Sequence, residues 1–189
     1  MAEAYNPELT FKEIVHKTIG RQGITELMNW LNDSDFFKSP SSTRFHGAFE
    51  GGLVEHSLNV YRRLKELANF YQLGASEESI AIVALFHDLC KVNSYKVEYR
   101  NAKTERGTWE KVPYYTRKED YPFGAHGGKS CYMVSYFMRL TPVEAAAIAS
   151  HMGSWDSGNY NNAGEVFQQN HLAWLLHVAD EAATYMDES

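Results

Sequence analysis

The segment "SIAIVALFHDLCKV", residues 79–92, is the most apolar run of the chain and decides the class of fold. Ser76 precedes it as a favourable helix N-cap, and Glu77 and Glu78 follow in the first turn, where the helix dipole favours acidic side chains. The run is apolar on nearly every side. We therefore expect one helix through Val92 that is buried at the centre of the protein.

Periodic apolar residues predict further helices on both sides of this run. Upstream, helical spacing extends over residues 8–32, with a break at residues 20–23, and over residues 53–71, with Gly74 as the C-terminal cap. Downstream helices are expected at about residues 129–140, 141–151 and 168–186, the second starting with a capping box formed by Thr141 and Glu144. Loops are expected at residues 32–52 and 153–165, which are rich in Gly, Ser or Asn.

Residues 94–118 break the helical pattern. The stretch "SYKVEYR" alternates polar and apolar residues, which places Tyr95, Val97 and Tyr99 on one face, and "TWEKVPYYTR" follows a turn-like segment as a second, aromatic-rich strand. Pro113 makes the second strand an edge strand. The expected fold is therefore mainly α, with one inserted β-hairpin at about 94–118.

The hairpin carries seven of the eighteen basic residues of the chain, interleaved with aromatic side chains. A flap that faces nucleic acid is one interpretation of this pattern. Acidic residues nearly balance the basic ones, so a solvated hairpin is favoured, and an oligomer contact is a third interpretation.

Length and composition predict a single folded domain over residues 1–189, because 44% of the residues are hydrophobic and 14% are aromatic. A net charge of −6 argues against a general nucleic-acid coat but allows a local basic site. No signal peptide or membrane span is recognisable. Cys90 and Cys131 form no metal-binding pattern, and we expect reduced thiols in a cytoplasmic protein.

Histidines recur at the predicted helices, although each one alone is weak evidence for a site. The chain has eight histidines, and a lone histidine on a buried helix is more often a hydrogen-bonded core residue than a ligand. The candidates on or next to helices are His56, His87, His126, His151, His171 and His177.

Asp88 strengthens the case for a site, because it directly follows the apolar run and aspartate is seldom buried unless it is paired or bound to a metal. Adjacent helical positions point about 100° apart. His87 and Asp88 could therefore both reach one ion, or two neighbouring ions. Lys91 lies on the same side of the helix, where an ammonium group suits a phosphoryl oxygen. A solvated lysine at a helix end is the alternative.

The ordered series of His56, His87–Asp88, His126, His151 and Asp180 resembles the H…HD…H…H…D signature of the HD superfamily of metal-dependent phosphohydrolases. "FHGAFEGGLVEHSLNV" is similar to the first-histidine segment of that superfamily, "ALFHDLCKV" to its HDxxK helix and "LLHVADEAATY" to its closing aspartate helix. Cys90 stands where glycine is common. The ordered set is far more specific than any single block.

This resemblance implies an HD-domain-like helical bundle that holds one or two divalent transition-metal ions. The mononuclear site of the family would be His56, His87, Asp88 and Asp180. His126 and His151 match the ligands of a second ion, with Asp88 bridging both ions. Imidazole with carboxylate suits Mn, Fe, Co, Ni or Zn, in contrast to calcium.

Alternatives exist for several of these residues. His151 could cap the end of its helix, and His126 could be a loop histidine among glycines. His177 lies three residues before Asp180, which makes it either a rival ligand or a partner that orients Asp180. We interpret His16 and His171 as structural.

Candidate substrate contacts flank the ligand positions. Arg44 and His46 precede the first ligand helix, while Lys129 and Ser130 follow His126, where backbone N–H groups and a lysine could receive phosphate. Trp155 and Tyr160 follow His151 and could stack on a base. An ordinary surface position is the alternative for each residue.

The expected activity is the hydrolysis of a phosphomonoester or phosphodiester by a metal-activated hydroxide, with Asp88 and Lys91 as the catalytic residues. By analogy, the substrate is a phosphate-containing small molecule, a nucleotide or the end of a nucleic acid, and a homo-oligomer is possible. A non-catalytic nucleotide or RNA sensor that keeps the metal is the alternative from another class. A structural helical protein with core histidines is the third.

Overall fold

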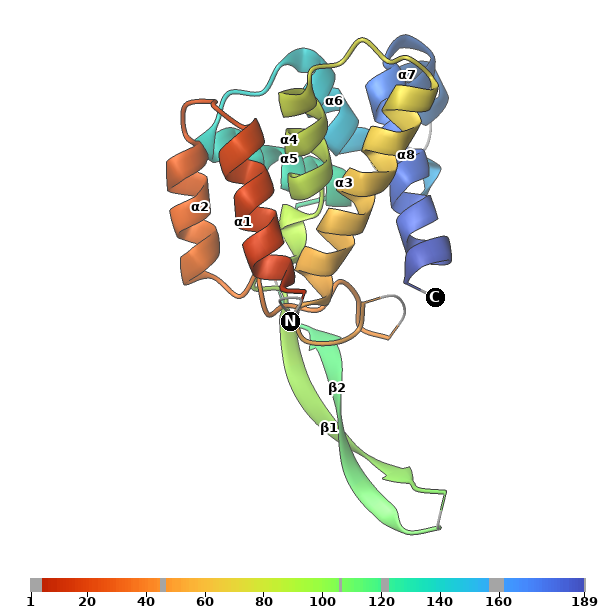
Figure 1. The fold of residues 1–189 in the computed structure, drawn as a ribbon. Coiled ribbons are helices and arrows are strands. Elements are labelled where there is room, and N and C mark those ends of the chain that lie inside the picture. Colours follow the sequence, from red (N-terminus) through yellow and green to blue (C-terminus); the bar gives the residue numbers. More distant parts are fainter. Residues whose placement is uncertain (1–4, 45–46, 106, 120–122, 157–161, 189) are drawn as a thin grey trace.

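A helical body with one long projecting hairpin is seen in the computed structural model, which describes residues 5–44, 47–105, 107–119, 123–156 and 162–188 (Figure 1). The α-helices are α1 (Pro7–Thr18), α2 (Ile24–Asp33), α3 (Gly52–Phe70), α4 (Glu77–Phe86), α5 (His126–Phe137), α6 (Pro142–Ser150), α7 (Ala163–Gln169) and α8 (His171–Ala182). The short helical turns are η1 (Leu89–Lys91), η2 (Gly153–Trp155) and η3 (Ala183–Asp187). The mainly α fold with an inserted hairpin is confirmed.

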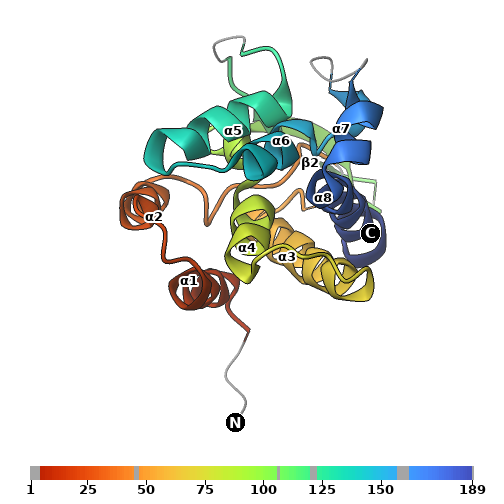
Figure 2. The same cartoon turned by 90° about the horizontal axis from the view of Figure 1, so that it is seen from above.

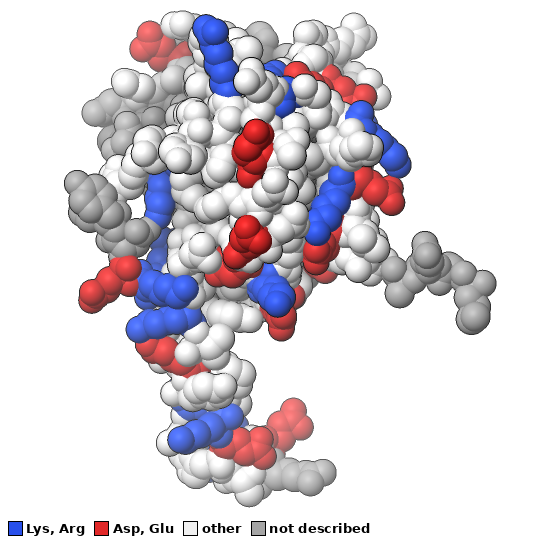
Figure 3. Space-filling model, turned by 90° about the vertical axis from the view of Figure 1, so that its left-hand side faces the viewer, with Lys and Arg blue, Asp and Glu red and all other residues white. Residues whose placement is uncertain are grey.

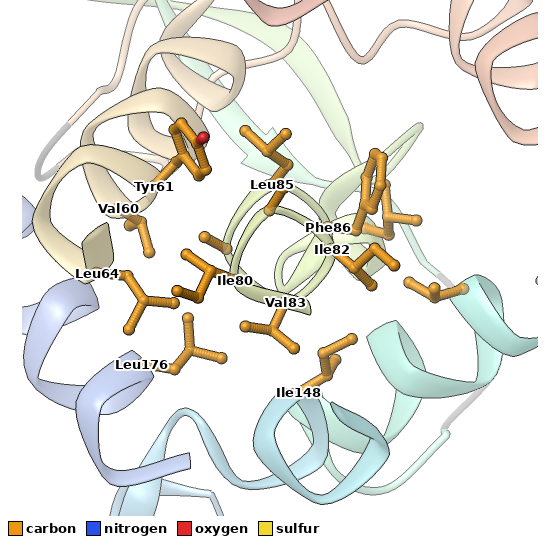
Figure 4. Packing of buried hydrophobic residues seen from close by; sticks show 14 of the residues in the cluster. Val60, Tyr61, Leu64, Ile80, Ile82, Val83, Leu85, Phe86, Ile148 and Leu176 are labelled. Carbon is orange, nitrogen blue, oxygen red and sulfur yellow. The ribbon is translucent and has the colours of Figure 1, made fainter. Parts of the chain in front are cut away.

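Helix α4 lies at the centre of the body, between α1, α3, α6 and α8 (Figure 2). Every residue from Ile80 to Phe86 is buried, because neighbours cover all sides of the helix. Figure 4 shows the side chains of α4 packed between Leu64 of α3, Ile148 of α6 and Leu176 of α8. Each large apolar side chain buried in this way contributes about 1.5–3 kcal/mol. The prediction of a buried central helix is confirmed.

Helix α4 ends at Phe86, six residues earlier than the expected end at Val92. The Cys90 N–H donates to the Ser130 Oγ at 3.1 Å, so it is not available for a helical bond. The chain turns through η1 instead. His87 and Asp88 consequently lie in a turn below α4, where both side chains are buried.

Helix α3 ends at Phe70, one residue before the predicted end, but Gly74 is not its cap. Gln72 takes the left-handed conformation, with φ of 53°. The Leu73 N–H donates to the Ala68 carbonyl at 2.8 Å, and the Gln72 N–H to the Asn69 carbonyl at 3.2 Å. This is a Schellman cap, with glutamine in the place where glycine is usual.

Helix α5 begins at His126, three residues before the predicted start, because its glycines belong to the helix and not to a loop. A Cβ on Gly127 would lie 2.4 Å from the Ala149 carbonyl oxygen, so glycine allows α5 to approach α6 closely. Asp156 accepts a hydrogen bond from the Gly127 N–H at 3.0 Å. The capping box of Thr141 and Glu144 at the start of α6 is confirmed.

The predicted helix over 168–186 is two helices. Asn170 leaves the helical conformation, with φ of −131° and ψ of 91°, and its side chain accepts from the Ala173 N–H at 3.2 Å to cap α8. Asparagine at an N-cap satisfies one of the first free N–H groups of a helix. Helix α7 therefore occupies part of the segment that was expected to be loop, and α8 continues into η3.

The strands β1 (Tyr95–Lys103) and β2 (Trp109–Arg117) pair antiparallel, from Tyr95 opposite Arg117 to Lys103 opposite Trp109. Among the strand residues whose burial the structure describes, Tyr95 is the buried one, and its hydroxyl donates to the Ser41 carbonyl at 3.1 Å. The hairpin is thus anchored at its base and projects from the body, with charges of both signs along it (Figure 3). None of the helices in the described ranges is long and apolar enough to cross a membrane.

Candidate metal centre

Six side chains from five parts of the fold meet beside the end of α4. Their potential ligand atoms form three overlapping groups, and within each group the atoms lie within 4.8 Å of one another. The groups are His56–His87–Asp88, His87–His151–Asp180 and Asp88–His126–His151. The structure therefore brings together all six residues predicted as ligands, and their binding of an ion stays a prediction.

Hydrogen bonds on the outer side of the cluster fix how the imidazoles face it. The Nδ1 of His87 lies 2.8 Å from the Ala84 carbonyl oxygen, and the Nδ1 of His151 lies 2.7 Å from the Ile148 carbonyl oxygen. Because a carbonyl only accepts, each Nδ1 carries the proton. A neutral ring then presents the lone pair of its Nε2 to the cluster, which is the form that binds a metal.

The inward nitrogen atoms lie close together beside the carboxylates of the cluster. The Nε2 atoms of His56 and His87 are 3.2 Å apart. The Nε2 of His151 is buried, and no atom of the described residues forms a hydrogen bond with it. A buried unsatisfied nitrogen is costly. A cation beside this atom removes the penalty, so this donor set fits a transition-metal ion.

Asp88 stands between two halves of the cluster. Its Oδ2 lies 3.6 Å from the Nε2 of His56 and 3.5 Å from that of His87. Its Oδ1 lies 2.7 Å from the Nε2 of His126 and 3.7 Å from that of His151. The two carboxylate oxygens thus face two separate sets of imidazoles, as a carboxylate shared by two ions must.

Half-buried Lys91 and buried Asp88 form an ion pair at the edge of the cluster, with 2.5 Å between Nζ and Oδ2. Burial alone would raise the pKa of Asp88, but the charge of Lys91 leads the interactions that outweigh it, and the pKa lies well below its usual range. Burial likewise would lower the pKa of Lys91, but Asp88 outweighs it and raises the pKa. Both groups are therefore ionised at neutral pH.

The pKa values of His56 and His87 move in opposite directions. Burial dominates at His87 and lowers its pKa to about 4. Burial would also lower the pKa of His56, but hydrogen bonds to Asp180 and Glu188 outweigh it and raise the pKa to about 9. The Nε2 of His56 lies 3.1 Å from Asp180 and its Nδ1 lies 3.0 Å from Glu188. In the absence of a metal, His56 is thus protonated, and its positive charge replaces that of one metal ion.

Cys90 lies beside the cluster, with its Sγ 3.3 Å from the Nδ1 of His126. It is buried, and burial raises the pKa of its thiol to about 12. A protonated, buried thiol is a poor ligand and a poor target for oxidants. Cys90 and Cys131 are both free cysteines.

His177 does not belong to the cluster. Its Nδ1 donates to the His151 carbonyl at 2.7 Å, and its ring stacks on Phe167 with 5.2 Å between centroids. His177 is therefore neither the rival ligand nor the partner of Asp180 that the sequence allowed. It instead holds the turn that carries His151.

The predicted substrate contacts have different surroundings. Trp155 lies at the rim of a cavity of about 650 Å³ beside the cluster, and Lys129 lines an adjoining cavity of about 330 Å³. Ser130 is buried and accepts from the Cys90 N–H, so its side chain supports the turn of Asp88. Arg44 is exposed and lines neither cavity. His46 and Tyr160 lie outside the described residues.

Three residues at the site were missed by sequence reasoning. Arg117 lines both cavities, Tyr185 lines the larger cavity and Glu188 bonds to His56. Arg117 was counted among the solvated charges of the hairpin, and only its place at the end of the second strand hints at the cavity. No sequence spacing singles out Tyr185 or Glu188.

Comparisons with known proteins agree with this geometry. The family model described as HD domain matches residues 53–185, which span the whole cluster. A curated protein from Methanocaldococcus jannaschii, dihydroneopterin 2′,3′-cyclic phosphate phosphodiesterase, is 24% identical over 156 residues, which is 80% of this chain. The chain spans about half, 53%, of the length of that relative. No solved structure gives a significant match.

Proposed function

The chain belongs to the HD domain family, and from this premise we propose that it is a metal-dependent phosphohydrolase that cleaves a phosphomonoester or phosphodiester. One observation carries the proposal. Two sets of inward imidazole nitrogens face the two oxygens of Asp88, and no described protein donor satisfies the buried Nε2 of His151. Such a donor set has no evident use in a purely structural core.

The residues fall into two ligand sets. His56, His87 and Asp180 would hold one ion with the Oδ2 of Asp88, and His126 and His151 would hold a second with its Oδ1. Divalent transition metals, such as Mn, Fe, Co, Ni or Zn, would supply acidity to a water molecule and positive charge to phosphoryl oxygens.

Lys91 has two roles in this proposal. Its ammonium group holds Asp88 in place, and it also lines both cavities beside the cluster. A phosphoryl oxygen that enters from either cavity would therefore meet a half-buried cation. Interactions of this kind stabilise the charge that develops on a transferring phosphoryl group.

The substrate class rests on the cavities and on the relative. The larger cavity is lined by the aromatic side chains of Trp155 and Tyr185 and by Asp88, His126 and Asp180 of the cluster. Aromatic faces of this kind can stack on a base. The relative is named for a cyclic phosphodiester of a heterocyclic compound. Both points support a nucleotide-like substrate or a nucleic-acid end.

The deciding experiment measures metal content and hydrolysis on the same preparations. Protein reloaded with Mn, Fe, Ni or Zn is expected to hold about two ions per chain and to hydrolyse bis(4-nitrophenyl) phosphate. Asp88→Ala is expected to lose both properties, whereas Glu181→Gln, which changes a neighbouring carboxylate outside the ligand groups, keeps the metal.

Each failure has a distinct meaning. Two bound ions without turnover of any monoester, diester or nucleotide would favour a metal-dependent sensor. About one ion would restrict the metal to the set around His56 and would give His126 and His151 other roles. No ion under any loading would refute the metalloenzyme.

A further inference from the structure

We propose that the substrate carries a second phosphate group, and that Arg117 and Lys118, at the base of the hairpin, bind it. This inference rests on the proposed function and deepens it, since it names a two-phosphate nucleotide as the substrate class. The hairpin would then be a part of the active site and not only a surface extension.

The two cavities beside the cluster adjoin each other. The walls that they share are Lys91, Tyr95, Arg117, Gly124 and His126. His126 and Lys91 also contact Asp88, so the reacting phosphate at the cluster would lie at the junction of the two cavities. The smaller cavity, of about 330 Å³, extends from that junction toward the hairpin.

The charge of the smaller cavity differs from that of the whole protein. No carboxylate lines it among the described residues, and its basic lining residues are Lys91, Arg117, Lys118 and Lys129. Asp88 already neutralises Lys91, but Arg117 and Lys118 form no ion pair within the described part of the chain. Unneutralised positive charge in a protein with a net charge of −6 is a local feature that attracts an anion.

Figure 3 shows basic side chains where the hairpin leaves the helical body, with acidic side chains beside them. Arginine suits a phosphate because its guanidinium presents two parallel donors, and lysine adds a point charge. Lys118 and Lys129 line the smaller cavity and not the larger one, whose carboxylates are Asp88, Asp156, Asp180 and Glu181. The smaller cavity is therefore the one that suits an anion.

The position of the two cations is fixed by the anchored end of the hairpin. Arg117 pairs with Tyr95, whose hydroxyl donates to the Ser41 carbonyl at 3.1 Å. The Lys118 N–H donates to the Ser94 carbonyl at 2.9 Å. When it binds a ligand, a side chain on such an anchored segment loses less conformational entropy than a side chain at the tip of the hairpin.

These features define the substrate by its chemistry. The reacting phosphate lies at the cluster, the second phosphate at Arg117 and Lys118, and the base beside Trp155 and Tyr185. A nucleoside 3′,5′-bisphosphate and a nucleic-acid end with a terminal phosphate share this pattern. They are two sources of one ligand chemistry.

The test compares affinities by titration calorimetry on protein reloaded with Mn. The wild type is expected to bind adenosine 3′,5′-bisphosphate about tenfold more tightly than either adenosine monophosphate, and the preference should weaken as salt rises from 50 to 200 mM. If chromatography shows that a probe is turned over, its KM replaces the dissociation constant. A dinucleotide with and without a 5′-phosphate distinguishes a nucleic-acid end from a free nucleotide.

Paired variants separate the subsite from general charge. Arg117→Gln with Lys118→Gln is expected to abolish the preference, whereas Lys103→Gln with Lys111→Gln removes the same charge farther along the hairpin and keeps it. Equal affinity for bisphosphate and monophosphate in the wild type would overturn the inference, and so would an equal loss in both double variants. Hydrolysis of bis(4-nitrophenyl) phosphate by the wild type tests the proposed function separately, because that probe has one phosphate.

Discussion

His87 and His151 occupy equivalent local positions, and this explains how the cluster is oriented. Each follows the last residue of a helix, and each donates from Nδ1 to the carbonyl three residues before it. The end of a helix leaves carbonyls without a partner. The imidazole satisfies one of them, and the same bond turns the Nε2 toward the cluster.

Glu188 orients His56 in the same way, by a hydrogen bond with its Nδ1. This contact leads to the first prediction. Its Oε1 lies 3.0 Å from the Nδ1 of His56 and accepts a second hydrogen bond from Asn59 at 3.0 Å. Glu188→Gln replaces a carboxylate with a weaker acceptor. We expect the affinity for the first metal ion to fall by about 10–100-fold. Competition with a chromophoric chelator measures this affinity directly.

Glu66→Gln is the matched control, because Glu66 is exposed and contacts Arg63 outside the cluster. It should leave the metal affinity unchanged. If Glu188→Gln and Glu66→Gln bind the metal as tightly as the wild type, Glu188 has no role in holding His56.

At the scale of single residues, the sequence predicted the gathering of the six candidate ligands because their order along the chain is itself a pattern. It allowed two roles for His177, and both were wrong, since spacing cannot show that a side chain bonds to a backbone carbonyl. Glu188 was missed for a similar reason: its contact with His56 joins positions 132 residues apart.

Among the elements, α6 depends on one buried carboxylate. Glu144 is 0% exposed and accepts hydrogen bonds from Arg21, from the Ser79 hydroxyl at 2.7 Å and from the Thr141 N–H at 2.8 Å. Glu144→Gln removes the buried one of the two carboxylates that pair with Arg21, the other being Glu78, while keeping the shape. We expect unfolding to become easier by about 3 kcal/mol, as measured by denaturant titration.

The same carboxylate gives the stability a pH dependence. Burial would raise the pKa of Glu144, but the hydrogen bond from Arg21 leads the interactions that outweigh it and lower the pKa below its usual 4.5. Its contribution is therefore complete above pH 4.5 and is lost as the pH falls through the lower folded-state value. The difference in unfolding free energy between wild type and Glu144→Gln should shrink in that range. A constant difference would show that the charge of Glu144 is not responsible.

The cap of α3 provides a stabilising prediction. Gln72 adopts φ of 53°, which costs an L-residue about 1 kcal/mol or more that glycine does not pay. Gln72→Gly should therefore stabilise the protein by up to about 1 kcal/mol, and thermal unfolding measures the gain. Gly74→Ala is the contrast, since no positive φ and no nearby atom oppose a Cβ there. Destabilisation by Gln72→Gly would contradict the strain at this cap.

Helices and the hairpin could be predicted because their apolar periods are long, but several ends could not. Helix α4 ends early because Ser130, forty residues away in sequence, takes the Cys90 N–H. The glycines of α5 suggested a loop because sequence alone does not reveal the close approach of α6. In both cases a tertiary contact overrides the local pattern.

At the scale of the whole molecule, the position of the cluster shows how it is connected to the rest of the fold. Its residues come from α3, the turn after α4, α5, the turn after α6, and α8, so it ties together the helices that surround the core. Without a cation, the buried Nε2 of His151 has no hydrogen-bond partner among the described residues, and metal binding would give it one.

Metal removal should therefore lower the stability of the entire body. A ligand that binds only the folded state at 100 times its dissociation constant adds about 2.7 kcal/mol, which for a chain of this size is about 5–10 °C in Tm. Scanning calorimetry before and after chelation, and after reloading with Mn or Zn, measures the shift. Asp88→Ala should abolish the response to metal because it removes the carboxylate that both ligand sets share. An identical Tm for metal-free and reloaded wild type would mean that the ions bind no more tightly to the folded state than to the unfolded chain, and that the six side chains form a polar core and not a metal site.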